Sequence, residues 1–292
     1  MTLRRRVLAW FARRPAATAV ALLSPGVGWL LLFFLAPIGL MLAYSTMRRG
    51  LYGGVVPGFT LENYQRFFDP LYLAILRRTV VWSLGCTVAC LVIGYPVAYV
   101  IARARRWRQL LLFLVVLPFW TSFLVRTFAM IFLLRDSGLV NGILLGAGLI
   151  DQPIALLYTP FAVMLGLVYG FLPLMILPIY ASLEKLDDSL LEAAEVLGAR
   201  PRARFFQVIL PLSLPGVAAG CLLTFIPALG SFITSDLLGG AKQVMIGNLI
   251  QNQFTVARNW PFGSAAAFVV MGLVLLAVVG YLRRRDAEAV VR

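Results

Sequence analysis

The sequence contains no histidine at any of its 292 positions. Histidine changes its charge near neutral pH, and it is a frequent general base and the commonest metal ligand in proteins. Its absence excludes a Ser-His-Asp arrangement and a histidine-ligated metal site. Most enzymatic chemistry is therefore unavailable, and we expect neither catalytic residues nor a bound metal in this chain.

A phosphate-binding loop of the form G-x-x-x-x-G-K-[ST] is also missing. The chain therefore cannot hold ATP in that way, and energy must come from another subunit or from an ion gradient. Cysteine is scarce, since Cys86 and Cys90 lie one helical turn apart and Cys221 stands alone. This spacing favours small apolar packing over a disulfide or a thiolate metal site. No cofactor is expected in this chain.

Charged residues are few and apolar residues dominate. Only 13% of the residues are charged, 61% are hydrophobic, and the mean hydropathy is +0.90. A soluble globule does not carry so much apolar surface. A helix of about 20 apolar residues crosses a hydrocarbon core of roughly 30 Å. We predict an all-α polytopic membrane protein with six transmembrane helices, near 21–44, 79–101, 110–134, 154–180, 212–233 and 262–282.

No internal repeat or low-complexity linker interrupts these stretches, so residues 1–292 are interpreted as one transmembrane domain. Cytoplasmic flanks of membrane proteins carry the excess of Lys and Arg. Seventeen of these residues lie on the side shared by both termini, the loop at 103–108 and the segment at 183–211, against eight on the other side. The N-terminal group is Arg4, Arg5, Arg6, Arg13 and Arg14, and the C-terminal group is Arg283, Arg284, Arg285 and Arg292. Both termini are expected in the cytoplasm, with the net charge of +14 serving topology and anionic lipid rather than nucleic acid.

One polar segment, residues 183–211, separates the fourth and fifth spans. Its apolar and acidic residues each recur at helical steps of three and four, which predicts an amphipathic helix. The apolar face is Leu183, Leu186, Leu190, Ala194 and Leu197, and the acidic face is Glu184, Asp188, Glu192 and Glu195.

Helix boundary signals divide this segment in two. Ser189 and Glu192 have the capping-box spacing, Gly198 suits a left-handed helix stop, and Pro201 can open the next helix. We expect the second, basic and aromatic piece to end at Pro211, where the next span begins. The segment is therefore predicted to be a helical hairpin that projects into water.

The same segment carries a recognisable spacing. Glu192-Ala193-Ala194 is followed after three residues by Gly198, and after nine more by Val208-Ile209-Leu210-Pro211. This resembles the EAA loop of bacterial ABC importer permeases, whose pattern is EAA, three residues, Gly, nine residues, then I-x-L-P. Only Val208 departs from it, conservatively.

The resemblance implies a type I ABC importer permease fold, in which this loop docks into a groove of a cytoplasmic ATPase dimer that binds the ATP. The implied coupling residues are Glu192, Ala193, Ala194, Gly198, Val208, Leu210 and Pro211. The alternative interpretation is a polar loop that serves only as a connector.

Prolines indicate where the spans bend, because each removes an amide and frees a carbonyl. They are Pro96, Pro118, Pro160, Pro173, Pro178, Pro215 and Pro227. The fifth span is the most disturbed, with Pro227 shortly before Ser231 and Asp236. Broken helices are tolerated in membranes where protein or a water-filled cavity satisfies the backbone. We interpret this stretch as a lining of a solute path, with proline-kinked packing as the alternative.

Arg126 lies within an apolar stretch. A charge at the centre of a membrane helix costs about 2.5–3.5 kcal/mol on insertion scales, so such residues usually face a cavity or a partner. A long side chain near a helix end can instead extend to the headgroups. Both interpretations fit the sequence, and Trp120 is either a packing aromatic or a wall for a cation.

Further stretches, at 94–99, 118–127, 134–141, 237–240 and 259–261, resemble the spermidine/putrescine branch of these permeases. The branch implies polyamine uptake in a bacterial inner membrane, a second permease subunit in a heterodimer, and an external solute-binding protein. One departure is Ser231, where members of the branch often carry an acidic residue, which leaves Asp236 as the nearby carboxylate. The candidate path residues are Trp120, Tyr169, Pro227, Ser231 and Asp236.

Two alternatives to polyamine uptake stay open. A permease of the same class could import thiamine, ferric ion or a phosphonate. A gradient-driven secondary transporter would show inverted repeats and a midspan ion-coupling carboxylate or histidine, and the sequence displays neither.

Overall fold

The computed structural model describes residues 15–290. Arg4, Arg5, Arg6, Arg13, Arg14 and Arg292, on which part of the predicted orientation depends, lie outside the described residues. Six helical stretches are long and apolar enough to cross a membrane, which confirms the predicted all-α fold and number of spans. They cover Leu22–Ser45, Pro70–Arg103, Phe123–Gly146, Pro160–Glu184, Pro201–Gly230 and Trp260–Gly280.

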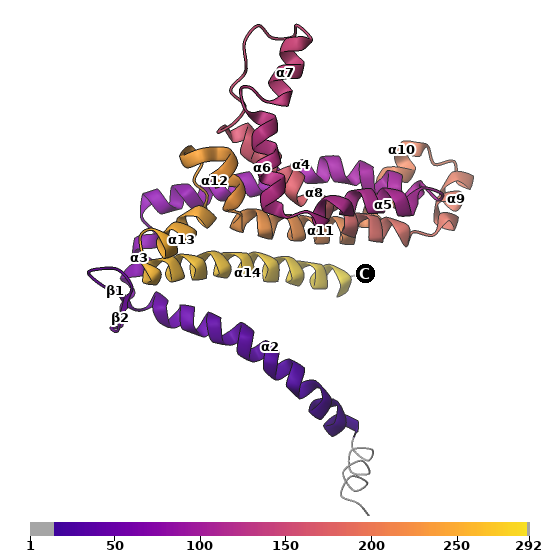
Figure 1. Ribbon diagram of the computed structural model, residues 1–292. Coiled ribbons are helices and arrows are strands. Elements are labelled where there is room, and N and C mark those ends of the chain that lie inside the picture. The colour runs from indigo at the N-terminus through magenta and orange to yellow at the C-terminus, as the bar shows by residue number, and fades with distance from the viewer. Residues whose placement is uncertain (1–14, 291–292) are drawn as a thin grey trace, which may run out of the picture. The chain divides into compact units, whose positions relative to one another are not determined.

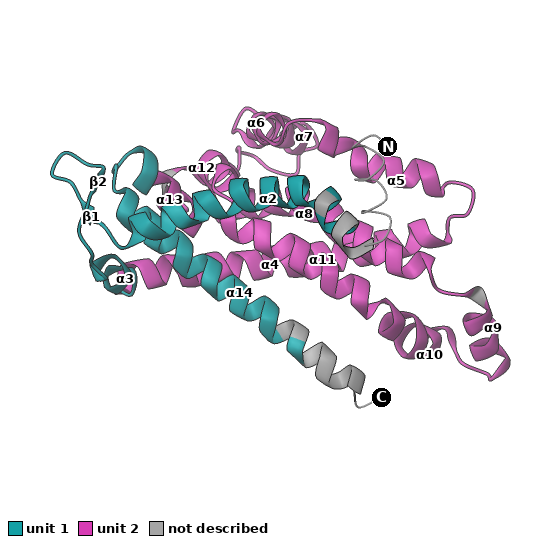
Figure 2. Ribbon diagram, turned by 90° about the horizontal axis from the view of Figure 1, so that it is seen from below, with its two compact units in different colours: residues 1–68, 253–292 teal, residues 69–252 magenta. Residues whose placement is uncertain are grey.

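The chain forms two compact units, drawn in different colours in Figure 2. Unit 1 holds the first and last spans, α2 (Pro15–Ser45) and α14 (Trp260–Val290), which pack together, and the short helix α3 (Glu62–Phe67). A small antiparallel hairpin, β1 (Arg48–Arg49) and β2 (Val55–Val56), was not part of the all-helical prediction. Its turn uses Gly53 and Gly54 at positive φ, which glycine adopts without strain.

Unit 2 is built on three long helices, α4 (Pro70–Arg103), α8 (Pro160–Glu184) and α11 (Leu210–Gly230), which lie side by side (Figure 1). Glycines bring the backbones together: a Cβ on Gly94 would meet Met175 at 3.2 Å, and one on Gly220 would meet the Met175 Sδ at 2.8 Å. Small residues at such contacts are the usual device for close helix packing in membranes. Cys86 and Cys90 are free and buried in this core, with their sulfur atoms 4.0 Å apart.

The third span differs from its prediction. Instead of one helix over 110–134, the chain forms α5 (Arg108–Val116), the 3-10 turn η1 (Leu117–Trp120) and α6 (Phe123–Leu134), followed by α7 (Leu139–Gly146). Thr121 and Ser122 are extended, with ψ of 147° and 137°, because Pro118 and the two hydroxyl residues favour a turn over a continuous helix. α6 therefore runs across the direction of α4, α8 and α11 (Figure 1).

The remaining elements of unit 2 lie at its two ends. α9 (Asp188–Val196) and α10 (Pro201–Arg204) occupy one end, and the short helices α12 (Ile233–Gly239), η3 (Gly240–Lys242) and α13 (Ile246–Thr255) begin at the other (Figure 1). Pro96, Pro173, Pro178, Pro215 and Pro227 lie inside helices as predicted, whereas Pro160 starts α8 and Pro118 belongs to η1.

Candidate functional site

The segment after the fourth long helix folds into the predicted helical hairpin, formed by α9 and α10. Gly198 has φ +78° and its successor Ala199 donates its N–H to the Ala194 carbonyl at 3.0 Å, which closes the left-handed stop. Pro201 opens α10, as predicted. The predicted capping box is wrong, because Asp187 is the N-cap and its carboxylate accepts the Ser189 N–H at 2.9 Å. This bond also lowers the pKa of the Asp187 carboxyl from its ordinary value.

The apolar residues of the hairpin do not all turn inward. Leu183 and Leu191 are buried against the core, but Leu190, Val196 and Leu197 are exposed, the last two at 88% and 86%. The predicted apolar face therefore does not form one buried surface, because the helix is rotated to bury Leu191 and leaves Leu190 and Leu197 exposed. Leu190, Ala193 and Leu197 instead form an exposed apolar stripe at helical spacing.

The acidic residues lie on the other side of α9, next to the buried Leu191. Glu192 and Glu195 are exposed, and Arg204 of α10 donates to the Glu195 carboxylate at 2.8 Å, closing the hairpin across its open side. At the base of the hairpin a polar hollow is lined by Tyr99, Arg103, Arg105, Leu191, Glu192, Glu195 and Arg204. The hairpin thus exposes apolar groups on one side of α9 and acidic groups on the other, where they face arginines at its base.

The hairpin continues into α11 without a break. Residues Phe205–Ile209 form a π-helical turn, in which the Leu210 N–H reaches the Phe205 carbonyl. The sequence predicted that this helix ends at Pro211. The prediction was wrong, because the helix continues through Pro211 into α11. The wider turn relieves the clash between a proline ring and the carbonyl four residues earlier, and Pro211 has no N–H to leave unpaired.

Phe205 of this turn joins the hairpin to α4. Its ring centroid lies 5.7 Å from that of Tyr95 and 6.2 Å from that of Tyr99, both edge to face. Tyr95 in turn forms a hydrogen bond with Ser213 of α11 at 2.9 Å. Val208 and Leu210 are half-buried on the same connection.

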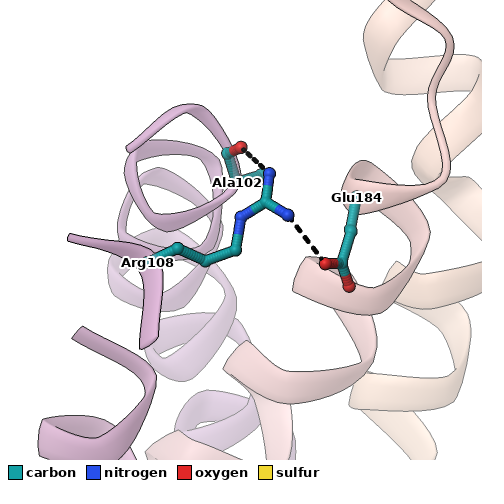
Figure 3. A network of polar contacts seen from close by, with 3 residues as sticks. All are labelled: Ala102, Arg108 and Glu184. Carbon is teal, nitrogen blue, oxygen red and sulfur yellow. Dashed lines mark hydrogen bonds and ion pairs between the residues drawn. The ribbon is translucent and has the colours of Figure 1, made fainter. Parts of the chain in front are cut away.

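A second contact lies where α8 ends and the hairpin begins. We call this junction and the junction of the hairpin with α11 the two roots of the hairpin. Arg108, at the start of α5, donates to the Glu184 carboxylate at 2.9 Å and to the Ala102 carbonyl at 3.2 Å (Figure 3). One guanidinium therefore ties together the ends of α4 and α8 and the beginning of α5. The pair is partly exposed, with side chains 32% and 41% accessible.

A separate aromatic region lies where the third span breaks. Phe123 and Phe171 stack with centroids 6.3 Å apart, and a Cβ on Gly170 would meet the Phe123 ring at 2.8 Å. The missing side chain of Gly170 thus allows α6 to approach the middle of α8. A shallow hollow beside these rings is lined by Phe123, Phe171, Pro227, Gly230, Ser231, Phe232 and Ile233.

The predicted path residues fall into four places. Pro227 and Ser231 line the hollow beside Phe123. Tyr169 lies one residue before Gly170, with its ring 5.9 Å from the Arg126 guanidinium. Trp120 is 74% exposed on η1 and packs edge to face on Phe113.

Asp236 lies apart from these residues, in a hollow lined by Phe128, Ile131, Phe132, Arg135, Tyr158, Leu237 and Gly240. Its carboxylate accepts from the Asn248 amide, which also donates to the Phe232 carbonyl at 3.0 Å. Asn248 is buried and receives the Ser235 hydroxyl at 2.6 Å. The one carboxylate near this end of the fifth span is therefore partly committed to a structural network.

Sequence reasoning missed Phe123, Phe171 and Asn248. Phe123 and Phe171 are ordinary apolar residues in a membrane span, and only the break at Thr121–Ser122 turns α6 toward α8. Asn248 gave no distinct signal, because α13 also carries Gln251, Asn252 and Gln253, and the sequence does not indicate which amide is buried.

Three comparisons place the chain among known proteins. A family model described as the inner membrane component of binding-protein-dependent transport systems matches residues 91–285. The chain is 47% identical over 254 residues to the spermidine/putrescine transport system permease protein PotB of Escherichia coli K12, covering 86% of this chain and 92% of that protein. PotB of Haemophilus influenzae is 46% identical over 256 residues, covering 87% and 90%.

Among solved structures, the chain resembles one chain of a bacterial alginate ABC transporter in complex with a periplasmic protein bound to an alginate pentasaccharide. The TM-score is 0.66 at 20% identity, covering 95% of this chain and 97% of that one. At this identity the likeness concerns the fold.

Proposed function

Because the chain belongs to the family of inner membrane components of binding-protein-dependent transport systems, we propose that it is the permease subunit of an ATP-driven polyamine importer. It is a multi-pass inner membrane protein and a transport component. The choice of spermidine and putrescine as solutes is carried by the 47% identity to PotB over 86% of the chain.

The hairpin α9–α10 is the proposed contact with a cytoplasmic ATPase dimer, which would bind the ATP. The stripe of Leu190, Ala193 and Leu197 gives apolar area for a groove, while Glu192 and Glu195 on the other side of α9 favour a partner that carries basic residues there. Exposure of two large apolar side chains at the tip of a polar hairpin is costly in water unless a partner covers them. In this proposal both termini and the hairpin would lie in the cytoplasm, where the ATPase would be.

Movement of the hairpin would reach the spans through its two roots. At the root next to α11, Phe205 packs on Tyr95 and Tyr99 of α4. At the root next to α8, Glu184 forms an ion pair with Arg108 of α5. Closure of the ATPase dimer would therefore shift α4, α8 and α11 together, biasing the permease between inward-open and outward-open states. A second permease subunit would complete the path, and an external binding protein would deliver the solute.

The test is uptake of labelled spermidine by a bacterium that lacks polyamine uptake and expresses this chain with the ATPase, permease and binding-protein genes beside it. We expect uptake that needs every subunit, stops when the ATPase is inactivated and is competed by putrescine. Uptake by this chain alone, without an ATPase, would contradict an ATP-driven importer. ATPase-dependent growth rescue by thiamine, ferric ion or a phosphonate, with no polyamine uptake, would contradict the solute.

A further inference from the structure

Arg126 is surrounded by aromatic rings. Its guanidinium carbon lies 5.2 Å from the ring centroid of Phe119, 5.5 Å from Phe123 and 5.9 Å from Tyr169. These rings come from three separate elements, η1, α6 and α8. We call them the aromatic cage.

Two of the three guanidinium nitrogens of Arg126 lack a hydrogen-bond partner in the described part of the chain. The Arg126 Nε and Nη1 atoms are buried and make no hydrogen bond within residues 15–290. Leaving buried charged donors unpaired is costly. The attraction to the ring faces is therefore the main compensation that the described part of the chain offers.

Arg126 also does not lie beside the end of α8. Tyr169 is nine residues from Pro160, where α8 begins, which corresponds to about 14 Å along a helix. The guanidinium beside Tyr169 thus lies well inside the length of α8, which favours an Arg126 that faces a cavity or a partner over one that extends to the headgroups.

Aromatic faces grouped around a positive charge are the recognition chemistry of alkylammonium groups. The cage adjoins the proposed path directly, because Phe123 also lines the hollow with Pro227 and Ser231. We propose that the aromatic cage is an ammonium subsite of the solute path and that Arg126 occupies it until a polyamine arrives. This inference rests on the proposed function.

A resident cation in the cage would suit a transporter. A subsite in a conduction path must bind its solute weakly enough to release it. Exchange of one cation for another leaves the cage occupied throughout, so the solute gains only the difference between two cation–π energies.

The experiment measures equilibrium binding of labelled spermidine to the assembled importer in lipid nanodiscs, without the binding protein. Arg126→Met removes the competing charge and keeps a long side chain, and we expect about threefold to tenfold tighter binding. Arg126→Lys keeps a cation and should stay within about twofold of the wild type. Binding of a neutral diol of similar length should not change. Arg66→Met is the matched control. The Arg66 guanidinium carbon lies 5.0 Å from the ring centroid of Phe262, and neither residue is part of the proposed path.

The cage itself is tested by adding Tyr169→Leu to Arg126→Met, which should remove the gain in affinity. Unchanged or weaker spermidine binding by an assembled Arg126→Met variant would overturn the proposal. So would assembly that fails for Arg126→Met and Arg126→Gln but succeeds for Arg126→Lys, because Arg126 would then pair with a carboxylate of another subunit. Absence of polyamine uptake by the wild-type importer would instead contradict the proposed function.

Discussion

The roots of the hairpin and the aromatic region are held together by different forces. The roots use charged and polar contacts, Arg108 with Glu184 and Tyr95 with Ser213, at distances near 2.9 Å. The aromatic region uses ring stacking between Phe123 and Phe171 and the close approach allowed by Gly170. Between them, α8 and α11 are packed through glycines without an intervening polar link.

The difference matches what each region is proposed to do. Partly exposed ion pairs contribute little net stability, so they can break and form again as the hairpin moves. Packed helices deform little, because closely packed cores switch between discrete arrangements rather than stretching. A displacement of the hairpin should therefore move α8 and α11 as rigid bodies, and so shift the aromatic region.

The largest expected effect comes from breaking the rigid contact. A Cβ at Gly216 would lie 2.5 Å from the Pro178 carbonyl and would also meet the Ser182 side chain. Gly216→Leu should therefore separate α11 from α8 and destabilise the protein by at least about 1–3 kcal/mol. We expect a lower thermal unfolding temperature in detergent and loss of uptake. Gly272→Leu is the control, since Gly272 has no neighbour within 4 Å, and an equal loss there would contradict a specific α8–α11 contact.

Substitution of Gly198 tests the role of the hairpin and leaves the contacts between the packed helices unchanged. At φ +78° a β-branched residue is strongly disfavoured, so Gly198→Val should misdirect the turn between α9 and α10. Uptake should fall about tenfold or more if the strain of 1–2 kcal/mol displaces the docked hairpin, while insertion and thermal stability stay near wild type. Gly198→Asn tolerates the left-handed conformation and should keep most of the uptake. Normal uptake by Gly198→Val at normal expression would show that the hairpin does not couple the ATPase to transport.

The Arg108–Glu184 pair should have a smaller effect. Arg108→Glu places two carboxylates together and frees the ends of α8 and α5, so we expect uptake to fall about twofold to fivefold, in line with 0.2–1 kcal/mol for an exposed pair. Adding Glu184→Arg should restore part of it, although the contact with the Ala102 carbonyl is lost. If the double variant transports no better than Arg108→Glu, the ion pair is not the link.

The same contrast explains which features were predictable from sequence. The turn of the hairpin follows local rules, so the stop at Gly198 and the start of α10 at Pro201 could be predicted from sequence, whereas the N-cap at Asp187 and the continuous helix through Pro211 were not. The rotation that buries Leu191 instead of Leu190 depends on core contacts made by other helices. The aromatic cage joins Phe119 to Tyr169, 50 positions apart, and required the break of the third span, which no periodicity indicated.

The smallest expected effect concerns the first turn of α9. The Ser189 N–H lowers the pKa of Asp187 below its ordinary value of 3.8, so the carboxylate form stabilises the folded hairpin. A lowered folded-state pKa means that this stabilisation is complete above the ordinary pKa and is lost as the pH falls through the lowered one. Asp187→Ala should therefore speed hydrogen exchange of the first amides of α9 at pH 7, with the difference from wild type shrinking in acid. Asp187→Asn keeps a capping oxygen without a charge, so its protection should not vary with pH in that range. If wild-type protection is equally independent of pH, the carboxylate does not hold this end of the hairpin, and a neutral acceptor suffices there.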